Sequence, residues 1–281
     1  MVDILVREGH GALVVLKAYF DASTRMASGV FCVAGFAFPK LQLLKFDRDW
    51  WALFGKYGGC HMKELTQRRG RFEGIEQVEA DRLIKEAVKI LRKRAWYGVV
   101  VSCNLREIDP LLPKWIQGFE HAYPVCCHMA MTILGSKIGE SGRDHEVAYT
   151  FETGDEYSGC AHRFMDQATK APEVKKSYRH SSHTFADKDA ALALQGADVL
   201  AWEWAKYFDE TVGKRIRPMR LSLAHLLLDR RKTGYDDKVY KLAHLTGDSL
   251  KRWSEQATEL GLTQLAEERV RKANRSSDEA A

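Results

Sequence analysis

Apolar and polar positions along the chain predict an initial β-hairpin followed by alternating helices and strands. Residues 13–20 and 30–38 are almost wholly apolar and rich in valine and aromatic side chains, which is typical of buried strands. The small polar residues 22–28 between them predict a hairpin loop, and Pro39 ends the second strand. Two further strands are predicted, at 96–103 and 147–151. Apolar residues at helical spacing predict helices over 41–57, 75–94, 119–138, 157–168 and 187–208.

This order of elements predicts an α/β fold in which helices flank a mixed sheet. We expect one main domain over residues 1–212, a helical C-terminal extension over 213–270 and a disordered tail over 271–281. The apolar residues of the extension include Leu245, Leu250, Trp253, Leu260 and Leu265. They would pack on the domain, or bind a protein partner or a second copy of the chain, and the sequence leaves both open.

The composition is that of an ordinary globular protein, with 45% hydrophobic and 29% charged residues among 281. No run of eighteen apolar residues and no signal-peptide core occurs, so we expect no membrane association and a cytoplasmic location. The six cysteines are too scattered for a disulfide framework. A net charge of +5 is compatible with a nucleic-acid partner without requiring one.

Three acidic residues are placed where a catalytic centre could form. Asp21 follows the first predicted strand, and Glu152 follows the strand at 147–151. Asp198 lies in the last long helix, beside the apolar stripe that should face the sheet. A partly desolvated aspartate needs a cation, a hydrogen-bond donor or a proton. Glu203, on the same helix, points away from that stripe and stays outside the predicted centre.

Convergence of Asp21, Glu152 and Asp198 would create a mutual repulsion that a divalent cation relieves. Mg²⁺ and Mn²⁺ prefer such hard oxygen ligands. Two such ions about 3.5–4 Å apart can activate water and stabilise the leaving oxygen during phosphodiester cleavage. For each acid taken alone, the alternative is a turn residue or a helix cap.

Four short motifs occur in order along the chain. They are Tyr-Phe-Asp-Ala-Ser at 19–23, Val-Ala-Gly-Phe at 33–36, His-Met-Lys-Glu-Leu at 61–65 and Leu-Gln-Gly-Ala-Asp-Val-Leu-Ala-Trp at 194–202. From about Lys17 to about Tyr207 the chain thereby resembles the bacterial and phage family named domain of unknown function 3800. The resemblance implies a ribonuclease H-like fold.

On that resemblance, Asp21 is the acid of the first strand, Glu152 the middle acid and Asp198 the acid of the last helix. His61 or Glu64 would help to position metal, water or phosphate. We therefore predict a nuclease that uses Mg²⁺ or Mn²⁺ to hydrolyse phosphodiester bonds of DNA or RNA. The fold's nucleases imply products with 5′-phosphate and 3′-hydroxyl ends.

The chain departs from the family pattern at two positions. The family's Asp-Glu-Ser-Gly is here Asp-Ala-Ser-Thr at 21–24, and the usual middle aspartate is here Glu152, followed by Asp155 and Glu156. These departures motivate a second hypothesis, a catalytically inactive module that binds nucleic acid or protein within a phage-defence or mobile-element assembly. Hydrolysis of a small nucleotide is a third hypothesis.

Two groups of basic residues flank the predicted site motifs: Arg68, Arg69 and Arg71, and Lys175, Lys176 and Arg179. Placed around an acidic centre, they would hold a phosphate backbone. The alternative is an ordinary solvated surface, balanced by 38 acidic residues.

Other residue groups favour core packing over chemistry. Four tryptophans could stack on bases, but tryptophans at helical spacing more often lie in a core or an interface: Trp50, Trp51, Trp202 and Trp204. Packing is favoured over a zinc site because no Cys-x-x-Cys pair occurs among Cys126, Cys127, His128, Cys160 and His162. Cys60 lacks the signature of a catalytic cysteine.

Overall fold

The predicted hairpin forms the centre of the sheet, as strands β2 (His10–Arg25) and β3 (Val30–Phe38). The computed structural model describes residues 4–7, 10–108, 110, 119–142, 144–153, 158–213, 217–227 and 241–245. Strand pairing in the hairpin continues to Arg25 opposite Val30, so the loop is shorter than the predicted range 22–28. Asp21 therefore lies inside β2, opposite Ala34, and does not follow the end of the strand.

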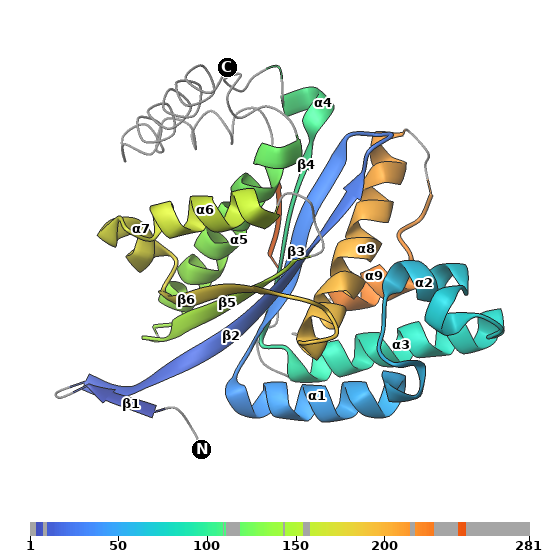
Figure 1. Cartoon of the computed structure of the whole chain (residues 1–281), viewed down its shortest axis with the longest axis horizontal. Helices are drawn as coiled ribbons and strands as arrows, with labels where there is room; N and C mark the ends of the chain where they lie inside the picture. The colour runs from blue at the N-terminus through green and yellow to red at the C-terminus, as the bar shows by residue number, and fades with distance from the viewer. Residues whose placement is uncertain are drawn as a thin grey trace, which may run out of the picture.

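Within the described residues the sheet is mixed and has seven strands (Figure 1). Its other strands are β1 (Ile4–Arg7), β4 (Tyr97–Asn104), β5 (Glu146–Glu152), β6 (His180–Ala186) and β7 (Lys241–Leu245). The main path runs in the order β6-β5-β2-β3-β4-β7, and β1 pairs with β2 outside it. Strands β2, β5 and β6 are parallel, whereas β3 is antiparallel to both β2 and β4.

Two strands at the ends of this path lie where the sequence predicted none. All residues of β6 are half-buried or exposed, so its polar sequence lacks the apolar pattern of an inner strand. Strand β7 lies within the range 213–270 that was expected to be helical, and that expectation is wrong for Lys241–Leu245. Because β4 is buried along its whole length, the backbone N–H and C=O groups on its outer side need hydrogen-bond partners. A paired strand supplies those partners, whereas a helix would leave the groups unsatisfied. The expected tail at 271–281 lies outside the described residues.

One layer of helices covers the face of the sheet that carries Phe20 and Phe151 (Figure 1). It consists of α5 (Phe119–Glu140), α6 (Ser158–Ala168) and the short α7 (Pro172–Ser177). Cys126 and Cys127 are fully buried in this core, which confirms packing as their role. Among the described helices, none combines the length and apolarity needed to cross a membrane.

The opposite face of the sheet is covered by a second layer of helices (Figure 1). Its members are α1 (Lys40–Phe54), α2 (Met62–Gln67), α3 (Gln77–Arg94), α8 (Leu192–Val212) and α9 (Leu221–Leu227). Short connections complete the described chain: the 3₁₀ turns η1 (Gly55–Tyr57) and η2 (Gly70–Phe72), and helix α4 (Leu105–Ile108). The helix predicted over 187–208 begins only at Leu192, because residues 187–191 form a turn that leaves β6.

A buried histidine in the first layer should make the fold sensitive to acid. His128 on α5 hydrogen-bonds to the hydroxyl of Tyr178, and burial lowers its pKa from 6.5 to about 4. The unfolded chain therefore takes up a proton at higher pH than the folded chain does, and stability is lost as pH falls from 6.5 towards 4.

The unfolding free energy of the parent protein should be lower at pH 4 than at pH 7. We predict that His128→Gln reduces this difference by on the order of 2 kcal/mol. Urea titrations at the two pH values measure this difference. The matched control is His225→Gln, because His225 is exposed on α9. An unchanged pH dependence in the His128 variant would contradict the assignment.

Candidate acidic active site

Asp21 and Glu152 are brought together by the parallel pairing of β2 with β5. In this ladder Phe20 lies opposite Phe151, so the two acids are the next residues of neighbouring strands. Since side chains alternate along a strand, both acids face the layer of α8 while the two phenylalanines face α5. Asp21 is only 2% exposed, whereas Glu152 is half-buried at the end of β5.

Asp198 reaches the same place from α8. This helix packs directly on β2 and β3, and Leu194, Ala201 and Ala205 are fully buried beside the aspartate. Asp198 itself is 5% exposed, which confirms the predicted placement on the stripe that faces the sheet. Glu203 is fully buried elsewhere on the helix, where Arg220 lies 3.3 Å from its carboxylate, so it stays outside this centre.

The ammonium of Lys188 lies between the two buried aspartates. Its Nζ atom is 3.0 Å from Oδ2 of Asp21 and 3.3 Å from Oδ1 of Asp198. Lys188 was not among the predicted site residues, because the predicted helix over 187–208 included it. The polar run 187–189 directly before an apolar helix was the available signal for a turn there.

The charges of this cluster shift its pKa values in opposite directions. Burial raises the pKa of Asp21 well above its usual value; Lys188 opposes that rise, and Asp198 and Glu152 add to it. Burial would lower the pKa of Lys188, but the attraction of Asp21 and Asp198 outweighs burial and raises it. Lys188 therefore stays cationic, and Asp21 is the carboxyl group that accepts a proton more readily.

Residues at the start of α2 also contact the carboxylate of Asp198. Its Oδ2 atom accepts a hydrogen bond of 2.7 Å from the Met62 N–H and lies 3.0 Å from Nδ1 of His61. Burial alone would raise the pKa of Asp198, but Lys188, His61 and the Met62 N–H together lower it below its usual value. Because Asp198 is thus an anion, the proton of a neutral His61 ring belongs on Nδ1. Nε2 is then available as an acceptor.

Gln195 holds three segments of the site together. Its Oε1 atom accepts hydrogen bonds of 2.9 Å from the Trp50 indole N–H and from the Cys60 N–H. Its amide donates to the carbonyl oxygen of Lys188 at 3.1 Å. Gln195 lies within the fourth motif, but nothing in the sequence indicated which groups it would bind. Trp50 is fully buried, so its predicted packing role is confirmed.

Arg71 and Glu64 are paired with residues of the loops beside the site. The Arg71 guanidinium donates to both carboxylate oxygens of Asp189, at 2.9 and 2.8 Å, and to the carbonyl oxygen of Gly58 at 2.8 Å. Glu64 accepts from the Arg71 backbone N–H at 3.3 Å. Arg71 therefore ties together loops beside the site. Glu64 faces that arginine, unlike His61, which faces Asp198.

The turn before His61 depends on a glycine. Gly59 has a φ of 120°, and a Cβ atom there would lie 2.7 Å from Nε2 of Gln195 and 2.9 Å from the guanidinium of Arg71. Cys60 follows this turn and is buried, and burial raises the pKa of its thiol well above the usual value. A thiol in that state is a poor nucleophile, which argues against a catalytic cysteine.

The two predicted basic groups lie at different ends of the parallel strands. Arg68 and Arg69 are exposed just after α2, close in sequence to His61. Lys175, Lys176 and Arg179 precede His180 at the start of β6, whereas the acidic centre lies beyond its other end. A seven-residue strand spans roughly 20 Å, so this second group is not part of the acidic centre.

The other predicted tryptophans differ in their exposure and contacts. Trp204 is 8% exposed and Trp202 lies under the guanidinium of Arg25, 4.3 Å from its ring centroid. Trp51 is 55% exposed on α1. Packing is thus the role of Trp204, and Trp51 is the most exposed of the four predicted tryptophans.

The donor set of the centre fits a hard divalent cation. Asp21, Glu152 and Asp198 offer carboxylate oxygens, which Mg²⁺ and Mn²⁺ prefer. With all three carboxyl groups ionised and His61 neutral, the Lys188 ammonium leaves the group a formal charge of minus two. One divalent ion would cancel that charge, and the second ion of the predicted pair stays a prediction.

No family model matches the chain, and no curated protein matches it. The resemblance to domain of unknown function 3800 therefore stays a prediction.

We predict that Lys188→Met destabilises the metal-free protein by about 3–5 kcal/mol, because it leaves two buried carboxylates without their cation. Mn²⁺ should restore more stability to this variant than to the parent, since the ion replaces the lost charge. Urea unfolding with EDTA or with Mn²⁺ measures both effects. The control is Lys89→Met, which removes an exposed ion pair with Glu86 and should cost less than about 1 kcal/mol. Equal stability of parent and Lys188 variant in EDTA would contradict the role given to Lys188.

Proposed function

We propose that the chain is a divalent-metal-dependent nuclease that hydrolyses phosphodiester bonds of DNA or RNA. The observation that carries this proposal is the convergence of Asp21, Glu152 and Asp198 on one face of the sheet, from two parallel strands and one helix. Buried carboxylates gathered on rigid elements are costly unless they bind a cation, and phosphoryl transfer uses such cations.

The strand arrangement supports a ribonuclease H-like fold. Five strands lie in the order β4-β3-β2-β5-β6, with an antiparallel half, β2 to β4, and a parallel half, β2, β5 and β6. This order and these directions are consistent with that topology. Membership of domain of unknown function 3800 belongs to the same proposal, and rests on the four motifs alone.

Asp21, Glu152 and Asp198 would hold the metal ion. A bound ion of this kind lowers the pKa of a bound water and neutralises charge on the phosphate. His61 would accept the proton of the attacking water at Nε2, because its Nδ1 atom is fixed by Asp198 and its side chain is 37% exposed. The Lys188 ammonium would offset negative charge that develops on the phosphate. Glu64 has no part in this scheme, since it faces Arg71.

A nucleic-acid strand would approach the centre over the end of α2. Arg68 and Arg69 are exposed there and would contact phosphates without reading sequence. Arg71 does not belong to this surface, because Asp189 and Gly58 already occupy its guanidinium. The group at Lys175 and Lys176 would contact only a substrate long enough to reach the other end of β6.

The proposal is tested by incubating single- and double-stranded DNA and RNA with Mg²⁺ or Mn²⁺. We expect the parent protein to cleave at least one of these substrates. The substitutions Asp21→Asn and Asp198→Asn should abolish cleavage, and His61→Gln should slow it by a factor of roughly 10². EDTA should also abolish cleavage. Glu203→Gln is a matched control, because Glu203 is a buried, cation-paired carboxylate on α8 outside the centre. Cleavage that survives both aspartate substitutions would refute the proposed centre.

A second function is favoured by the position of Lys188. Its ammonium already compensates both buried aspartates without a metal, as expected of a module that only binds nucleic acid or protein. Such a module would belong to a phage-defence or mobile-element assembly. It predicts no cleavage by the folded parent, with nucleic-acid or protein binding that persists in EDTA and in Asp21→Asn and Asp198→Asn.

A further inference from the structure

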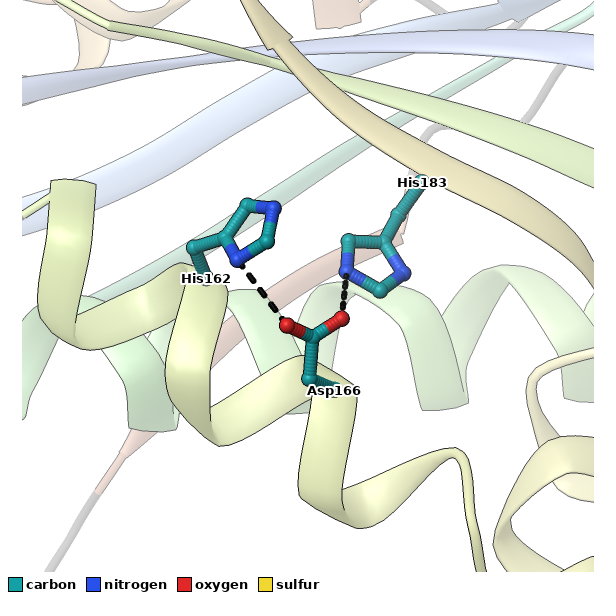
Figure 2. A group of neighbouring side chains, drawn as sticks. All are labelled: His162, Asp166 and His183. Carbon is teal, nitrogen blue, oxygen red and sulfur yellow. Dashed lines mark ion pairs between the residues drawn. The ribbon is translucent and has the colours of Figure 1, made fainter.

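A second group of metal-ligating side chains lies away from the acidic centre, between α6 and β6 (Figure 2). His162 and Asp166 are one helical turn apart on α6, and His183 comes from β6. The Asp166 carboxylate lies 3.1 Å from Nδ1 of His162 through one oxygen and 3.2 Å from Nε2 of His183 through the other. The three side chains therefore point toward one another from two elements.

The spacing of these groups suits a small metal ion. One ligand atom of each residue lies within 4.8 Å of the other two. Zn²⁺ binds imidazole nitrogen and carboxylate oxygen at about 2.0–2.2 Å, so modest side-chain rotations would bring all three onto one ion. His162 and Asp166 are 51% and 49% exposed, which leaves an open side through which an ion and a water ligand can enter.

The buried member of the group is oriented by a further histidine. The side chain of His183 is only 8% exposed, and its Nδ1 atom lies 3.0 Å from Nε2 of His180. The other nitrogen, Nε2, is thereby directed at Asp166. Histidines that bind metals are commonly fixed in this way through the ring nitrogen that does not bind.

We propose that His162, Asp166 and His183 form a Zn²⁺ site with water as the fourth ligand. Two imidazoles and one carboxylate suit a borderline ion such as Zn²⁺, whereas the all-oxygen acidic centre suits Mg²⁺ or Mn²⁺. The bound ion fastens α6 to β6, which ends the main path of the described sheet. This site is independent of the proposed nuclease function.

Zinc binding is measured on full-length protein without a polyhistidine tag, stripped with chelator and titrated with Zn²⁺ by calorimetry. We expect one site that weakens at least tenfold in His162→Ala and in His183→Ala. His162 is half-exposed, so its variant should fold even if the His183 variant does not. His225→Ala is the matched control on α9, and Asp198→Asn removes a ligand of the acidic centre. Both should keep the site.

Two results would overturn the proposal. One is a parent protein that binds no Zn²⁺, which would leave the group as a hydrogen-bonded cluster around Asp166. The other is unchanged affinity in folded His162→Ala. If zinc binding were lost in Asp198→Asn and kept in His162→Ala, the ion would belong to the acidic centre. Replacement by Co²⁺ adds a spectroscopic check, because its visible absorption should report nitrogen ligands in the parent and change in His162→Ala.

Discussion

The candidate site depends on one ammonium group held between two buried aspartates. Lys188 lies 3.0 Å from Asp21 and 3.3 Å from Asp198, in a place where neither carboxylate can be stabilised by bulk water. Hydrogen bonds hold the turn that carries Lys188. Gln195 donates to the carbonyl oxygen of Lys188, and the carboxylate of the next residue, Asp189, accepts two hydrogen bonds from the guanidinium of Arg71.

The fold supplies this arrangement through its layers. Parallel strands β2 and β5 place two acids side by side, and α8 brings Asp198 onto them from the facing layer. Strand β6 then leads directly into the turn of Lys188, and the same strand carries His183 five residues earlier. A zinc ion at His183 would therefore anchor the strand from which the central lysine of the acidic site is positioned. The two proposed sites would share one element while using ions of different chemistry.

The elements that could be predicted from the sequence are those whose strong apolar pattern dictates burial. The central hairpin and the long helices are fixed by such patterns, and Asp198 was placed correctly because it interrupts a buried stripe. Strand β6 was missed because an edge strand needs few apolar residues. Lys188 and Gln195 were not predicted as site residues because they meet their partners only after the chain has packed. Gln195, for example, lies 135 positions from Cys60 and 145 positions from Trp50, and Lys188 pairs with Asp21 at the start of the chain. Arg71 was predicted to bind phosphate, but a basic side chain in a sequence does not reveal an internal carboxylate partner.

We propose that Asp21 and Asp198 form a divalent-cation site in which Lys188 is the resident counter-charge. Anomalous diffraction from crystals grown with Mn²⁺ would locate such an ion. We expect a manganese peak within about 2.0–2.6 Å of oxygens of both aspartates, with the Lys188 ammonium moved away from at least one of them. A fully ordered site without such a peak, with Lys188 still bridging both carboxylates, would contradict it.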